Sequence, residues 1–215
     1  MLDFSFLFLL GLNLGGTMPF PMPNNITNIE SYSPKLFPSI GVDALKWLNE
    51  KSGVSAGLRF ENKGMKSIAS VKEYSMNFED FHGRFNGTVD TEMTFNYIGL
   101  PILAHYILTK KISVYAGAYY AYLLNGEFKG AANDGTLNSG SGKVEIIREE
   151  YDFSKELRRH DAGISIGLNY LPYSERLLVS FDFNYGFLSV FQSDFTGITD
   201  DMQNIYGKLS VGYLF

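Results

Sequence analysis

The feature that most constrains this chain is an alternation of apolar and polar side chains that recurs along most of its length. In the last ten residues, Leu209, Val211, Tyr213 and Phe215 alternate with small or polar residues. Because successive side chains of a strand point to opposite faces, this period predicts strands with one apolar face. The predicted strands lie at about 4–15, 39–44, 54–61, 98–106, 112–124, 161–170, 177–187 and 208–215. The segment 112–124 is apolar at both parities, so its facing stays open.

The lengths of the connections alternate as well. They are short at about 49–52, 109–111 and 171–176, and long at about 17–35, 67–89, 125–160 and 192–204. Tight turns at one end and long loops at the other are typical of outer-membrane barrels. We therefore predict one domain, 1–215: an all-β, closed, eight-stranded antiparallel up-and-down transmembrane β-barrel. Both termini are expected at the short-turn, periplasmic end. The loop 125–160 is expected to be polar and mobile, and parts of it and of 67–89 to extend the hairpins.

Composition excludes several classes of protein. The chain has no cysteine, so it forms neither disulfides nor cysteine-based metal sites. Its formal net charge of −5 argues against a nucleic-acid partner. The longest apolar run, 6–10, is far shorter than the ~20 residues of a membrane-spanning helix. Asp3 precedes this run and no Lys or Arg does, so we expect a mature chain whose signal peptide has been removed.

Alternation alone does not say which face points outward, because a soluble lipocalin-like barrel alternates too. The polar parity is rich in Gly, Ser and Asn, which suits a narrow lumen, and few Lys or Glu occur on the strands. Aromatic residues also gather near strand ends, as membrane-interface girdles require: Trp47, Tyr170, Tyr173, Tyr206, Tyr213 and Phe215. We therefore predict a bacterial outer-membrane barrel. Its expected lipid-facing and girdle residues are Trp47, Tyr170, Phe181, Phe183, Tyr185, Tyr213 and Phe215.

Three segments carry a family resemblance. Residues 206–215 resemble the closing strand of bacterial outer-membrane proteins, whose final Phe is read by the barrel-assembly machinery. Residues 57–66, with 12–15 and 96–102, are similar to the outer-membrane β-barrel family of Bacteroidetes that includes the PorT-like proteins. The resemblance implies the fold, the outer membrane, the assembly machinery as a partner, and an envelope or secretion partner as one expectation.

The polar parity brings seven ionisable residues into the predicted lumen: Asp43, Arg59, Glu61, His105, Asp161, Asp182 and Lys208. Their formal sum is −2 with the histidine neutral. Buried charges require partners, and eight strands enclose only enough space for side chains. We therefore predict an ion-paired network that closes the lumen, with a small cation-preferring pore as the alternative.

The remaining candidate sites are weaker. General-base catalysis needs a histidine oriented by a carboxylate beside a nucleophile. His82 and the pair His160–Asp161 lie near no recognisable nucleophile, so we predict no catalytic residue. Asp194, Asp200 and Asp201 share a loop but match no EF-hand spacing, so we predict no metal and no cofactor. A basic group near the outer end suits lipopolysaccharide phosphates: Arg148, Lys155, Arg158 and Arg159.

These observations predict a non-enzymatic outer-membrane barrel with a plugged lumen, associated with the envelope or secretion or binding a partner through its loops. A small porin-like diffusion channel is the alternative. A soluble lipocalin-like ligand carrier and an envelope enzyme are further alternatives.

Overall fold

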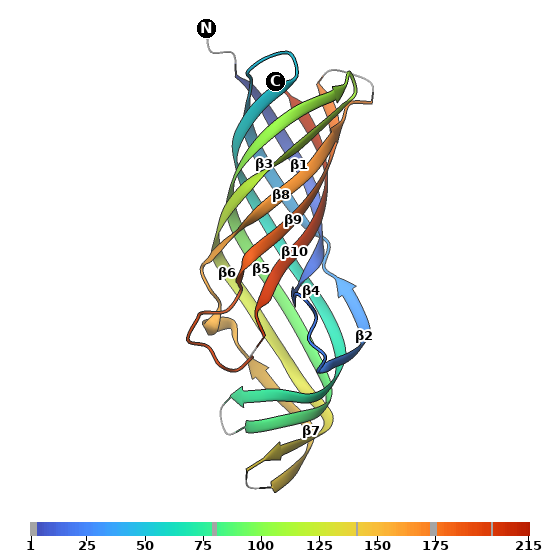
Figure 1. Ribbon diagram of the computed structural model, residues 1–215, viewed down its shortest axis with the longest axis vertical. Helices are drawn as coiled ribbons and strands as arrows, with labels where there is room; N and C mark the ends of the chain where they lie inside the picture. The colour runs from blue at the N-terminus through green and yellow to red at the C-terminus, as the bar shows by residue number, and fades with distance from the viewer. Residues whose placement is uncertain (1–3, 79–80, 141, 173–175, 199) are drawn as a thin grey trace.

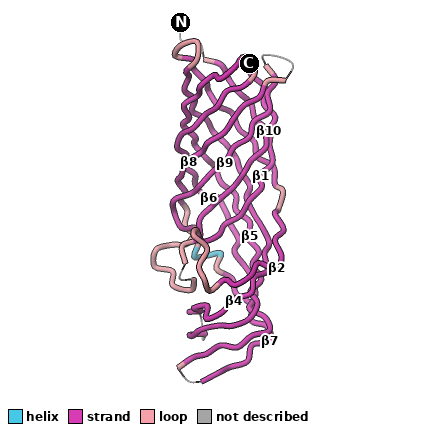
Figure 2. Tube along the Cα trace, turned by 45° about the vertical axis from the view of Figure 1, so that its right-hand side comes forward, coloured by secondary structure: helices cyan, strands magenta, loops and turns pink. Residues whose placement is uncertain are grey.

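A computed structural model describes residues 4–78, 81–140, 142–172, 176–198 and 200–215. Eight antiparallel strands form a closed ring (Figures 1 and 2). In ring order they are β1 (Ser5–Pro19), β3 (Phe37–Trp47), β4 (Ser52–Phe78), β5 (Phe81–Thr109), β6 (Ile112–Ser139), β8 (His160–Tyr170), β9 (Leu177–Ser189) and β10 (Met202–Leu214). Pairing of β1 with β10, from Leu7 opposite Leu214 to Pro19 opposite Met202, closes the ring. The expected eight-stranded barrel is therefore present, with β2 (Ile26–Pro34) and β7 (Gly142–Asp152) outside the ring.

The short turns and both ends of the chain lie at the same end of the barrel (Figure 1). Asn49 Oδ1 accepts hydrogen bonds from the backbone N–H groups of Lys51 and Ser52, which fixes the β3–β4 turn. Thr109 Oγ1 accepts the N–H groups of Lys111 and Ile112 between β5 and β6. Side chains that mimic a backbone turn in this way favour tight connections. The β8–β9 turn includes 173–175, so the predicted girdle residue Tyr173 lies outside the described residues.

Parts of 67–89 and 125–160 extend the hairpins, as predicted, but the strands take up more of these connections than expected. β4, β5 and β6 have 27, 29 and 28 residues, so most of 67–89 and much of 125–160 is strand rather than loop. The segment expected to be a mobile polar loop is instead largely the β6–β7 hairpin, paired from Lys129 opposite Asp152 to Ser139 opposite Gly142. β2 occupies much of 17–35. A one-turn 3-10 helix, η1 (Ser154–Glu156), joins β7 to β8. Within the described part of the chain, no helix is long and apolar enough to cross a membrane.

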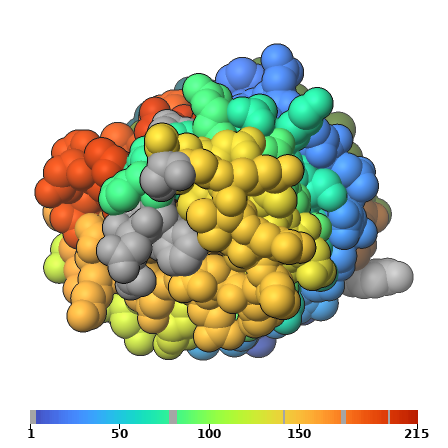
Figure 3. Space-filling model, turned by 90° about the horizontal axis from the view of Figure 1, so that it is seen from below, coloured from blue at the N-terminus to red at the C-terminus, as the bar shows by residue number. Residues whose placement is uncertain are grey.

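The three long strands continue beyond the ring as a second sheet. β4 pairs with β3 as far as Glu61 and then with β2 from Met65 to Val71. β6 pairs with β8 over 112–122 and then with β7 over 129–139. The result is a five-stranded antiparallel sheet in the order β2-β4-β5-β6-β7, which we call the extension sheet. It forms the end of the molecule opposite the termini (Figure 1), and β6 and β7 cover much of that end when it is viewed along the barrel (Figure 3).

The polarity of the two faces reverses between ring and extension sheet. In the ring, β4 exposes Leu58 and Phe60 outward and buries Arg59 and Glu61. Beyond Gly64 the inward face carries Met65, and the outward Lys66 side chain is exposed. On β6, Tyr115, Tyr119 and Leu123 face inward while Tyr120 and Tyr122 face outward, which settles the facing of 112–124. The outer face of the ring therefore suits an apolar medium, and that of the extension sheet suits water.

Candidate functional site

An ionic network fills the ring at the level of Arg59. The Arg59 guanidinium lies 2.7 Å from Asp43 Oδ2 and 3.2 Å from Asp182 Oδ1, and all three side chains are buried. β3, β4 and β9 supply these residues because each presents its polar parity to the interior. A guanidinium between two carboxylates satisfies charges that would be strongly unfavourable alone.

A second group lies farther toward the extension sheet. Glu61 accepts a 3.0 Å hydrogen bond from Lys208 Nζ and lies 3.5 Å from Lys63 Nζ. Lys208 Nζ is also 3.9 Å from Asp182, which joins the two groups. The Lys63 ammonium lies 5.2–5.5 Å from the ring centroids of three tyrosines, Tyr97, Tyr119 and Tyr206. Aromatic faces at this distance stabilise a cation, so the interior holds this charge by rings as well as by a carboxylate.

Sequence reasoning missed Lys63, although a signal was present. Lys63 has the same parity as Arg59 and Glu61 on one strand, and the predicted strand ended at residue 61, two residues before it. With Lys63 included, the buried network has four carboxylates against three cations. Its formal sum is therefore −1, counting His105 as neutral, instead of the predicted −2.

The structure also places His105 and Asp161 inside the barrel, but outside the ion pairs. His105 Nε2 lies 2.7 Å from Ser55 Oγ. Asp161 Oδ2 accepts hydrogen bonds from Tyr119 Oη at 3.2 Å and from Asn204 Nδ2 at 3.0 Å. All seven predicted lumen residues are thus buried, five in connected ion pairs and two in hydrogen bonds to neutral groups.

The predicted lipid-facing set divides in the structure. Tyr170, Phe181, Phe183, Tyr213 and Phe215 are exposed on the outside. Tyr185 is half-buried, with Phe20 against its ring and its hydroxyl donating to Gln203. Trp47 was assigned to the wrong face: it shares the parity of Asp43, and its ring packs edge-on against His105 at the lumen mouth, 6.3 Å between centroids. Tyr206 is also inside rather than in a girdle, because it belongs to the tyrosine group around Lys63.

Within the part of the chain that the structure describes, neither histidine outside the lumen is hydrogen-bonded or ion-paired to a carboxylate. His160 faces outward, with Nδ1 2.5 Å from Tyr120 Oη, while Asp161 points into the barrel. Adjacent residues of a strand cannot share a face, so this pair cannot act together. His82 is exposed on β5. Among the described residues, no three His, Cys, Asp or Glu side chains are grouped so as to hold a metal ion, and this includes the described aspartates of 192–204.

Three of the four predicted basic residues gather. Lys155, Arg158 and Arg159 line one surface depression together with His160. Arg158 and Arg159 also donate to the backbone carbonyls of Phe191, Leu123 and Leu124. Arg148 lies elsewhere, on β7, where it pairs with Glu150 at 3.0 Å.

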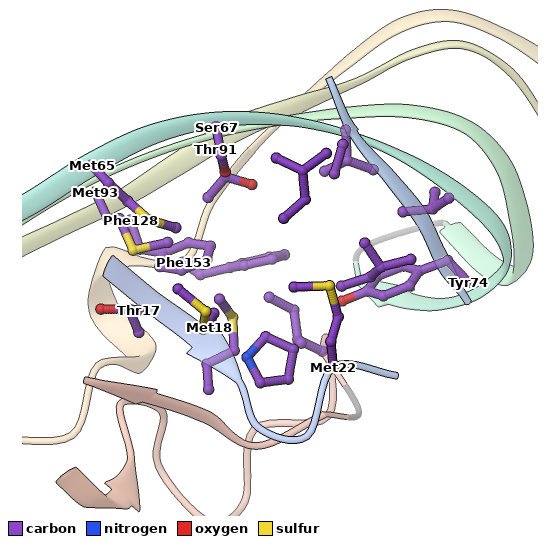
Figure 4. A pocket seen from close by; sticks show the side chains of 18 of the residues that line it. Thr17, Met18, Met22, Met65, Ser67, Tyr74, Thr91, Met93, Phe128 and Phe153 are labelled. Atoms are coloured by element: carbon purple, nitrogen blue, oxygen red, sulfur yellow. The ribbon is translucent and has the colours of Figure 1, made fainter. Parts of the chain in front are cut away.

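A cavity of about 130 Å³ lies against the inward face of the extension sheet, and we call it the methionine cavity (Figure 4). Met65 and Met93 reach into it beside Phe128 and Phe153, with Met18 and Met22 on the opposite side. Met76 and Met202 complete the set, so every methionine within the described residues lines one space. No local pattern could have predicted this cavity, because its residues are scattered from position 17 to position 202.

The ring, its outward apolar band and its polar interior agree with a family comparison. A family model described as the outer membrane protein beta-barrel domain matches residues 2–192. The chain belongs to this family. This outer membrane β-barrel is therefore located in the outer membrane of a bacterium.

The solved structures to which the outer membrane β-barrel is similar include the following two. One is Ail, the attachment invasion locus protein of Yersinia pestis, at 11% identity over 99% of each chain, with a TM-score of 0.46. The other is Neisserial surface protein A, at 10% identity over 98% of this chain and 95% of that chain, with a TM-score of 0.41. No curated protein matches the chain.

Membership of this family orients the molecule. Bacterial outer-membrane barrels have short periplasmic turns and longer extracellular loops. By this rule we expect the end with the short turns and both termini to face the periplasm. The extension sheet and the methionine cavity are then expected on the extracellular side.

Proposed function

We propose that this protein is a non-enzymatic outer-membrane barrel with a closed lumen, which acts by binding through its extracellular extension sheet. The observation that carries the proposal is the buried ionic network of Asp43, Arg59, Glu61, Lys63, Asp182 and Lys208. An eight-stranded barrel has an interior that side chains can fill, and here paired charges and tyrosines occupy it. The chain then extends three strands well beyond the bilayer, which a lumen-based activity does not require.

Conductance in planar lipid bilayers tests the closed lumen. We expect no discrete current steps from the purified protein, and a general porin added afterwards to the same bilayer shows that insertion would have been detected. Reproducible steps from the wild-type protein would overturn the proposal and support the alternative, a small diffusion channel.

For the partner we propose a component of the cell envelope, and lipopolysaccharide phosphates are the first candidate. Lys155, Arg158 and Arg159 line one depression at the extracellular end, and cationic side chains bind phosphate through charge-assisted hydrogen bonds. Lys155→Glu should weaken binding to lipopolysaccharide vesicles several-fold at low salt, whereas Lys143→Glu, an exposed change on β7, should not. Equal binding by both variants would remove this candidate.

Two further partners follow from the sequence resemblance. We propose that the barrel-assembly machinery reads the strand ending at Phe215, and that a secretion apparatus is one form of envelope partner, as in the PorT-like family. Deletion of Phe215 should lower the amount of folded protein in the outer membrane, measured by gel mobility before and after boiling. Undiminished assembly would contradict the role of the final residue.

A further inference from the structure

We propose that the methionine cavity is a binding site for the hydrocarbon chain of a small, uncharged molecule from the external medium. This inference rests on the proposed function, because it names a ligand class for the extension sheet.

The lining of the cavity selects an uncharged occupant. No Asp, Glu, Lys, Arg or His is among the described residues that line it. Three of its hydroxyl groups donate to the protein: Thr17 Oγ1 to Asn204, Tyr32 Oη to the Gly15 carbonyl, and Tyr151 Oη to the Asp90 carbonyl, whereas the described part of the structure gives no hydrogen bond to the side chains of Ser67 and Tyr74. Burial raises the pKa of Tyr74 and of Tyr151, so both phenols stay neutral. A charged group placed here would lose its hydration without gaining a partner.

The size of the cavity favours an apolar molecule over water. Its volume of about 130 Å³ would hold several water molecules, but water needs two to four polar partners. Apolar cavities of ~150 Å³ stay dry and bind small apolar molecules such as benzene.

The shape and the side chains favour a chain-like molecule. On β4 the lining residues Met65, Ser67, Ala69 and Val71 follow one another at alternate positions, a span of ~20 Å at the usual rise of a strand. Methionine is unbranched and polarisable, so it adapts its shape to an apolar surface. By contrast, the buried members of the neighbouring core cluster that do not line the cavity include no methionine: they are Phe85, Ala132, Leu137 and Ile146. The adaptable residues thus gather where the space is, and β1, β4, β5, β10 and the β1–β2 connection all contribute them.

Nuclear magnetic resonance of the methionine methyl groups tests the proposal directly. The protein is labelled with ¹³C-methyl methionine, placed in phospholipid nanodiscs without detergent, and titrated with 1-decanol. We use the variant Ile147→Met, since residue 147 is 81% exposed on β7 and its methyl group reports nonspecific effects. Saturable shifts of several cavity signals, with the signal from position 147 unmoved, support the proposal.

Two variants and a labelled lipid separate the alternatives. Ala69→Phe fills the cavity and should weaken decanol binding at least tenfold, whereas Ile68→Phe, on the neighbouring outward position of β4, should leave it unchanged. Absence of saturable shifts, or equal binding by both variants, overturns the proposal. Broadening of the cavity signals by a chain-spin-labelled phospholipid, without decanol, would overturn the external source and assign the site to a membrane lipid. If the barrel does not conduct ions and does not bind decanol, only the proposed ligand class is refuted. If the barrel conducts ions, the closed lumen is refuted, whether or not decanol binds.

Discussion

Replacement of Arg59 by alanine should strongly destabilise the barrel. The Arg59 side chain is only 6% exposed and lies within 3.2 Å of both Asp43 and Asp182, whose side chains are 3% and 0% exposed. Arg59→Ala leaves two carboxylates buried without their shared cation. Breaking a buried ion pair by removing one partner costs about 3–5 kcal/mol. This corresponds to a decrease of about two to three and a half orders of magnitude in the ratio of folded to unfolded protein.

Arg148 provides a matched control. Its guanidinium makes an ion pair of similar length, 3.0 Å to Glu150, but the side chain is 54% exposed on β7. Exposed pairs contribute about 0–1 kcal/mol, so Arg148→Ala should change stability little. Both substitutions remove a guanidinium from an ion pair of similar length, and the two ion pairs differ in how deeply they are buried.

The measurement is the free energy of unfolding from reversible urea titration of the protein in lipid vesicles, followed by tryptophan fluorescence and gel mobility. The triple variant Arg59→Ala, Asp43→Asn, Asp182→Asn should recover much of the lost stability, because no buried charge then lacks a partner. If Arg59→Ala does not fold, recovery of folding by the triple variant tests the same reasoning. The reasoning is refuted if Arg59→Ala costs no more than Arg148→Ala, or if the triple variant is as unstable as the single one.

Two further predictions concern the outer surface. Phe183→Lys, at mid-strand on the lipid-facing side of β9, should lower the free energy of unfolding in lipid vesicles by about 2–4 kcal/mol. Ile147→Lys on the extension sheet should lower it little, and equal losses for the two variants would show that the bilayer boundary is misplaced. The Lys35 ammonium lies 2.8 Å from Glu92 and lowers the pKa of that carboxyl by a hydrogen bond. The pair therefore stabilises the fold at pH values above the unfolded pKa of ~4.3, and this contribution is lost as the pH falls through the lower folded pKa. Because the pair is partly exposed, its contribution is below about 1 kcal/mol, and Lys35→Met should remove that part of the acid dependence; an unchanged pH profile would contradict it.

The eight-stranded ring could be predicted from the sequence because its rules are local. Alternation fixes the facing of each strand, and turn length fixes which strands are neighbours. The inward charges Asp43, Arg59 and Asp182 followed from parity alone, before any partner was known. Ion pairing itself depends on register across the barrel, since Arg59 and Asp182 are 123 positions apart.

The errors arose where alternation weakens or changes meaning. Trp47 and Tyr206 were placed by their nearness to strand ends, although parity puts both inside. The lengths of β4, β5 and β6 were underestimated because the apolar parity changes face beyond the bilayer, so the lipid-facing pattern stops before the strand does. The methionine cavity could not be predicted for a different reason: it exists only after β1, β2, β4, β5, β6, β7 and the segment 197–202 have come together.

The reversal of polarity explains how one barrel wall can serve two environments. Within the bilayer the outward positions must be apolar, and the narrow interior is left to polar residues that have to pair with one another. Beyond the bilayer the outer face meets water and carries Lys66, Glu92 and Arg148, so the inward face is free to be apolar. The extension sheet thus follows the arrangement of a soluble lipocalin-like barrel, with its apolar face around a cavity, while the ring below it follows the opposite arrangement. The closed ring anchors the chain in the membrane. The apolar interior, in which we propose that a ligand binds, lies beyond the bilayer, where water on the outer face allows the inner face to be apolar.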